Sequence, residues 1–101
     1  MAVTSTLTED DKKLTLAIKG RFDFVQHQDF RSAYEQQDSK PDQFVVDLKD
    51  TTYVDSSALG MLLMLRDKAK ASGRAVTLAN CRGAVKQVLD IANFGKLFAI
   101  V

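Results

Sequence analysis

Two adjacent hydroxyl groups, those of Ser56 and Ser57, stand where the sequence predicts the opening turn of a helix. A short β-branched and aromatic run typical of a buried strand, 44–48, precedes them, and an apolar run, 61–65, follows. A helix N-terminus presents free backbone N–H groups and a partial positive charge, so it tolerates an anion well. A serine at this strand-to-helix junction can therefore cap the helix or, if exposed, carry a phosphate group.

Spacing alone favours the capping role, taken by Asp55 or Ser56, because aspartate and serine are common N-cap residues. The surroundings favour the second role. The first turns of the helix contain more large apolar residues than one sheet-facing surface accommodates: Leu59, Met61, Leu63 and Met64. A partly exposed apolar patch around a modifiable hydroxyl is what a switchable protein interface requires. We therefore expect Ser56 to carry a phosphate.

The other residues with chemical potential indicate no catalytic site. His27, the single histidine, lies in a polar helical segment and is expected to be a solvated surface residue. Cys81, the single cysteine, excludes an internal disulfide, and one cysteine with one histidine cannot build a Cys/His metal site. Three aspartates could converge at one sheet end, but such carboxylates are usually caps and turn-formers: Asp23, Asp47 and Asp55. The glycines are scattered and form no phosphate-binding loop. We expect no enzyme activity, no metal and no cofactor.

The composition indicates one soluble globular domain over residues 1–101. A hydrophobic content of 46% with 27% charged residues is ordinary for such a protein and too apolar for a disordered one. The net charge of +1 favours neither nucleic acid nor an anionic membrane surface as a partner. No apolar run approaches the ~18 residues of a membrane span, and the polar segment 1–7 is unlike a signal peptide. We expect a cytoplasmic monomer that binds neither nucleic acid nor membrane.

Hydrophobic periodicity predicts the elements that position these residues. Strands are expected at 3–7, 14–18, 44–48, 75–79 and 97–101, the first two paired as a hairpin. Helices are expected at 24–37, capped by Asp23, at 56–72, ended by Gly73, and around 85–92, closed near Gly95. Phe30, Ala33 and Tyr34 share a face of the first helix. The face of the second helix toward the sheet consists of Ala58, Leu62, Leu65 and Ala69.

The predicted order is therefore β-β-α-β-α-β-α-β. Strands that alternate with helices form parallel pairs joined by right-handed crossovers. The sequence thus predicts an α/β fold, with an open, mostly parallel mixed sheet of about five strands and three helices.

Several segments together resemble the STAS domain of bacterial anti-sigma factor antagonists. The segment Asp55-Ser56-Ser57-Ala58-Leu59-Gly60, preceded by Val45-Val46-Asp47-Leu48, is similar to the signature of that family. Gly20-Arg21-Phe22-Asp23 resembles its G-x-x-D segment after the second strand, and Ala84-Val85-Lys86-Gln87-Val88-Leu89 resembles its third-helix segment. The element order agrees along nearly the whole chain. One departure is Ala58, which stands where the family often has glycine and which a helix accepts well.

The resemblance implies that Ser56 is phosphorylated by a serine kinase, often the anti-sigma factor itself, and dephosphorylated by a serine phosphatase. It implies an anti-sigma factor antagonist that binds an anti-sigma factor or kinase-type regulator when unphosphorylated and releases it when Ser56 is phosphorylated. The expected partner-binding residues are Asp23, Asp55, Ser56, Ser57, Leu59, Met61 and Leu63. One alternative within the family is an accessory subunit of a lipid ABC transporter. Another, suggested only by hydroxyls and carboxylates near one sheet end, is a small nucleotide-binding enzyme.

Overall fold

The structure is a computed structural model that describes residues 2–8, 12–35 and 41–101. Its main body is a five-stranded sheet in which β1 and β2 are antiparallel and the other neighbours are parallel. In spatial order the strands are β1 (Val3–Thr8), β2 (Lys13–Ile18), β4 (Gln43–Asp47), β6 (Ala75–Ala79) and β7 (Ala99–Ile100). The predicted α/β class, the hairpin and the mostly parallel sheet of five strands are confirmed.

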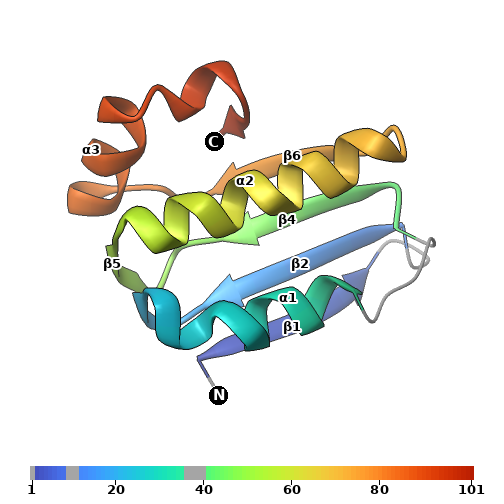
Figure 1. The fold of residues 1–101 in the computed structure, drawn as a ribbon, viewed down its shortest axis with the longest axis horizontal. Coiled ribbons are helices and arrows are strands. Elements are labelled where there is room, and N and C mark those ends of the chain that lie inside the picture. The colour runs from blue at the N-terminus through green and yellow to red at the C-terminus, as the bar shows by residue number, and fades with distance from the viewer. Residues whose placement is uncertain (1, 9–11, 36–40) are drawn as a thin grey trace.

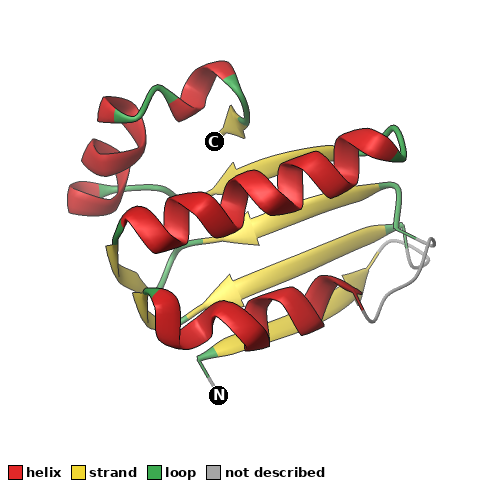
Figure 2. Ribbon diagram, in the orientation of Figure 1, coloured by secondary structure: helices red, strands yellow, loops and turns green. Residues whose placement is uncertain are grey.

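Two helices cover one face of this sheet. Figure 1 shows α1 (His27–Glu35) and α2 (Ser56–Ala71) in front of the sheet, running roughly along the strands, and Figure 2 shows both on the same side of the sheet. A third helix, α3 (Gly83–Ile91), follows β6 and contacts β5 (Thr51–Val54) beyond the carboxyl ends of the parallel strands. The helix α2 begins at this same end of the sheet, directly after β5.

The main departure from prediction is a second, two-stranded sheet formed by β3 (Gly20–Phe22) and β5. Neither strand was predicted, because the expected strands ended at residues 18 and 48 and the next expected element in each case was a helix. After β4 the chain turns, with Thr51 N donating to Leu48 O at 3.1 Å, and then runs in β5 to the start of α2. Each missed strand has only three or four residues, which is too short for a recognisable alternating pattern.

The core lies between the sheet and the two covering helices. Alternate residues of β2 and β4 are buried, as expected for strands with one face against helices. All four residues predicted for the sheet-facing side of α2 are buried: Ala58, Leu62, Leu65 and Ala69. From α1, Phe30 and Tyr34 are buried, and Ala33 packs against the core. The faces predicted from helical periodicity are therefore confirmed.

The helix ends follow local backbone chemistry. Gly73 has φ +70° and Arg74 N donates to Ala69 O at 2.7 Å, so the predicted glycine stop of α2 is confirmed. The expected end of α3 near Gly95 is wrong by about a turn, because Asn93 takes a left-handed conformation and the short helix η2 (Phe94–Lys96) follows. The final strand is likewise shorter than predicted.

The first predicted helix is divided. Its cap, Asp23, begins a 3-10 turn, η1 (Phe24–Gln26), and the α-helix itself starts at His27. The predicted end of this helix at Gln37 lies outside the described residues, as does part of the charged turn expected between β1 and β2.

Candidate functional site

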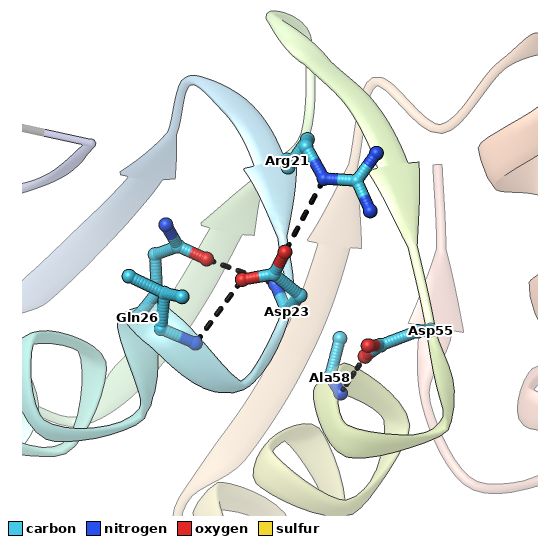
Figure 3. Close-up of polar contacts among 6 residues, drawn as sticks. Arg21, Asp23, Gln26, Asp55 and Ala58 are labelled. Atoms are coloured by element: carbon cyan, nitrogen blue, oxygen red, sulfur yellow. Dashed lines mark hydrogen bonds and ion pairs between the residues drawn. The ribbon is translucent and has the colours of Figure 1, made fainter.

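Two short parallel strands bring the beginnings of two helical segments together. β3 pairs with β5 so that Phe22 lies opposite Val54, and the residue after each is an aspartate, Asp23 or Asp55. Each aspartate is the N-cap of the segment that follows it, η1 after Asp23 and α2 after Asp55. The first turns of η1 and α2 therefore lie side by side (Figure 3). The structure thus gathers residues predicted for partner binding from two separate parts of the chain.

Asp55, and not Ser56, caps α2. The backbone of Asp55 is extended, and its Oδ1 atom accepts a hydrogen bond from Ala58 N at 2.9 Å. Ser56 is the first residue of α2 and is exposed, and its hydroxyl group forms no hydrogen bond with the part of the chain that the structure describes. Ser57 is half-buried. The fold therefore uses the carboxylate to start the helix and leaves the Ser56 hydroxyl accessible to another protein.

Asp23 is held by several hydrogen bonds. Its Oδ1 atom accepts from Val25 N at 3.1 Å, and its backbone N–H donates to Gln26 Oε1 at 2.9 Å, which completes a capping box. Its Oδ2 atom accepts from Arg21 Nε at 3.3 Å (Figure 3). This ion pair is largely exposed on the arginine side, so its contribution to stability is at most about 1 kcal/mol. The capping box makes η1 a well-defined turn, and the role of Asp23 in partner binding remains a prediction.

The apolar patch expected on α2 is smaller than predicted. Leu59 and Leu63 are half-buried and pack against the core, and Met64 is 46% exposed. The expectation that Met61 contributes to an exposed patch is wrong, because only 4% of it is exposed. Met61 lines a small cavity between α1 and α2 with residues that include Phe30 and Tyr34. Met61 is buried because α1 packs against α2 and covers a face of α2 that does not contact the sheet.

Sequence reasoning missed three exposed apolar residues, two on η1 and one on β5. Phe24 is 68% exposed, Val25 is 81% exposed, and Tyr53 is 40% exposed. The guanidinium carbon of Arg21 lies 4.0 Å from the centroid of the Tyr53 ring. The sequence did contain a signal that Phe24 and Val25 are exposed. The buried face of α1, extended back by three and four residues from Phe30, includes positions 27 and 26 but not positions 24 and 25.

The other candidate residues from the sequence, Asp47, His27 and Cys81, have structural surroundings that account for them. Asp47 accepts hydrogen bonds from Asn80 Nδ2 at 2.8 Å and from Lys49 N at 3.0 Å, as a turn-forming residue does. His27 stacks on the Phe24 ring with the centroids 5.4 Å apart. Burial is the main cause that raises the pKa of the Cys81 thiol, which makes this cysteine less reactive than a free one.

Neither a metal cluster nor a membrane span is present among residues 2–8, 12–35 and 41–101. Within these ranges, no three or more His, Cys, Asp or Glu side chains group in a way that could hold a metal ion. No helix in the same ranges has the length and apolar character needed to cross a membrane.

Comparison with known proteins agrees with this geometry. A family model described as "Mlab, STAS domain" matches residues 5–101. The chain belongs to the STAS domain family. A STAS-domain containing protein of Pseudomonas aeruginosa strain UCBPP-PA14 is 52% identical over 100 residues, which are 99% of this chain and 99% of that protein. The resemblance identified from the segments around Asp23 and Ser56 is thereby confirmed at the level of the family.

Solved structures share the fold at low sequence identity. A Thermotoga maritima protein described as a candidate anti-sigma factor antagonist has a TM-score of 0.85 at 17% identity, covering 97% of this chain and 84% of that one. The Bacillus cell fate determinant SpoIIAA in its phosphorylated form has a TM-score of 0.71 at 14% identity, covering 99% of this chain and 91% of that one. At these identities the likeness establishes the fold of a STAS domain.

Proposed function

We propose that this STAS domain is an anti-sigma factor antagonist that acts by phosphorylation-dependent partner switching. In its unphosphorylated form it binds an anti-sigma factor or a kinase-type regulator, and phosphorylation of Ser56 releases that partner. A serine kinase and a serine phosphatase set the phosphorylation state in the cytoplasm. The observation that carries the proposal is the separation of roles at the start of α2, where Asp55 caps the helix and Ser56 is left exposed.

The helix start suits a phosphate within the domain itself. A phosphoserine at the first position of α2 lies at the positive end of the helix dipole, which stabilises an anion there by about 0.3–1 kcal/mol. The cap is retained because the Ala58 N–H bonds to Asp55 and not to Ser56. We therefore expect the phosphorylated domain to keep its fold.

The same phosphate is unfavourable inside a protein interface. It brings a charge of about −1.5 to −2, and desolvating an unpaired ion costs several kcal/mol. Each ~1.4 kcal/mol lowers affinity tenfold, so this cost exceeds the small gain within the domain. The surface that loses its partner consists of Ser56 with its predicted neighbours Asp23, Asp55, Ser57, Leu59 and Leu63.

Affinity capture with matched baits tests the proposal. Wild-type, Ser56→Ala and Ser56→Asp proteins are exposed side by side to cytoplasm of the organism that makes the protein. We expect a protein retained by the first two baits and lost with Ser56→Asp, while the melting temperatures of all three stay alike. Ser5→Asp, which adds the same charge on the exposed surface of β1, serves as the control and should retain the partner. Equal retention by Ser56→Asp and wild type would refute partner switching.

Phosphate mapping by mass spectrometry tests the site separately. Protein isolated from its native cells should carry phosphate on Ser56, and the Ser57→Ala variant should still be phosphorylated. Phosphate on Ser57 and none on Ser56 would contradict the assignment. The two alternatives predict other outcomes: a transporter subunit co-purifies with a membrane-associated ATPase whatever the state of Ser56, and a nucleotide-binding enzyme shows ATP or GTP binding by calorimetry.

A further inference from the structure

We propose that Phe24 and Val25 are the apolar anchor residues of the partner interface, and that they insert into an apolar cleft of a protein partner. The inference rests on the proposed function, because it assigns these residues to the same interface as Ser56. The inference goes further by stating that the partner's binding surface is apolar, which the predicted site residues do not indicate.

The first observation is the exposure of two neighbouring large apolar side chains on a well-defined turn. Phe24 is 68% exposed and Val25 is 81% exposed. The capping box between Asp23 and Gln26 holds the turn: Val25 N donates to Asp23 Oδ1 at 3.1 Å, and Asp23 N donates to Gln26 Oε1 at 2.9 Å. Because the backbone of this turn is already fixed, little backbone conformational entropy is lost when its side chains are bound, which favours them as interface anchors.

The second observation is continuity with the Ser56 surface. The register that places Phe22 opposite Val54 places η1 beside the first turn of α2 (Figure 3). Tyr53, 40% exposed on β5, extends the apolar surface toward the residues that precede Ser56. Because η1 lies beside the start of α2, a partner that covers the start of α2 can also contact the exposed residues of η1.

The third observation concerns the carboxylates of Asp23 and Asp55. It favours an apolar cleft on the partner over a cleft lined by basic residues. The Asp55 carboxylate accepts from Ala58 N, and the Asp23 carboxylate accepts from Val25 N and Arg21 Nε, so both have partners within the chain. Neither requires a cation from the partner. An apolar cleft without cations also leaves a phosphate on Ser56 unpaired, which is the condition under which phosphorylation breaks the complex.

Photocrosslinking in the native cells tests the assignment even while the partner is unidentified. The photoreactive amino acid p-benzoylphenylalanine replaces Phe24 in the Ser56→Ala and Ser56→Asp backgrounds. The matched control carries it at Ile91, which is 83% exposed and lies on α3, on the opposite side of α2 from η1 (Figure 1). We expect an adduct from position 24 in the Ser56→Ala background only, containing the same protein that the baits retain, and none from position 91.

Affinity measurements then test the energetic role of the anchors. Calorimetric titration of the purified partner should show that Phe24→Ala and Val25→Ala each weaken binding at least tenfold, about 1.4 kcal/mol. Ile91→Ala should change it less than twofold. All three side chains are largely exposed, so the melting temperatures of the variants should be unchanged. A loss of affinity then cannot be attributed to unfolding of the variant.

The outcomes separate this inference from the proposed function. If the baits retain a Ser56-dependent partner but position 24 forms no adduct and Phe24→Ala binds normally, the anchors are wrong and partner switching stands. If the adduct at position 24 forms equally in both backgrounds, or position 91 forms it as strongly, the shared interface is refuted. If no Ser56-dependent partner exists, both proposals fail.

Discussion

Replacing Asp55 with alanine tests which residue caps α2. The change removes the Oδ1 atom that accepts a hydrogen bond from Ala58 N at 2.9 Å, and it removes a negative charge from the positive end of the helix. Replacing Ser56 with alanine removes a hydroxyl group that is exposed and forms no hydrogen bond with the described residues. The two adjacent substitutions should therefore differ in their effect on stability.

The loss of the cap at Asp55 costs about 1 kcal/mol, within a range of about 0.5–2 kcal/mol. Loss of the charge–dipole interaction adds about 0.3–1 kcal/mol at low ionic strength. For a domain of this size each kcal/mol lowers the melting temperature by about 4–8 °C. Ser56→Ala should be neutral or slightly stabilising, because alanine is the better helix former by about 0.5 kcal/mol or less.

Urea unfolding monitored by circular dichroism measures both effects. The variant Asp55→Asn serves as the control, because asparagine caps about as well as aspartate and lacks the charge. Its deficit should be smaller than that of Asp55→Ala and should shrink further in high salt. A loss of stability in Ser56→Ala as large as that in Asp55→Ala would refute the separation of roles, because Ser56 would then be part of the cap.

Two further predictions concern the core and the cysteine. Leu62→Ala should lower the free energy of unfolding by about 2–5 kcal/mol, because the residue is fully buried between α2 and the sheet. Leu63→Ala, half-buried on the next position, should cost less in the same urea titration; equal losses would contradict the assigned faces. The Cys81 thiol should react with iodoacetamide more slowly in the folded protein than in urea at any pH near 8. Its raised pKa lowers the thiolate fraction in the folded state, so the reaction's pH midpoint should shift upward on folding, and a downward shift would contradict this.

Local patterns were sufficient for most of the fold. The alternation of Leu14, Leu16 and Ile18 predicted a half-buried strand, and the spacing of apolar residues along α2 predicted its buried face. Both succeed because strand and helix geometry decides which side chains share a face, whatever those side chains then contact. The stop at Gly73 was predictable for a similar reason, since its left-handed backbone is set by one residue type.

Contacts between distant segments were not predictable. The pairing of β3 with β5 joins two runs of three and four residues that carry no period of their own. The burial of Met61 depends on where α1 crosses α2, and no pattern within α2 reports the position of a neighbouring helix.

The sequence by itself indicated the family and the predicted phosphorylation site, because Asp55 and Ser56 lie together in one short segment at a strand-to-helix junction. Only the tertiary structure decided that Asp55 is the cap and that Ser56 is exposed, since both residue types cap helices and the choice depends on where the helix begins. It also brought the start of η1, capped by Asp23, beside the start of α2, because that proximity is produced by strand pairing between segments far apart in the chain.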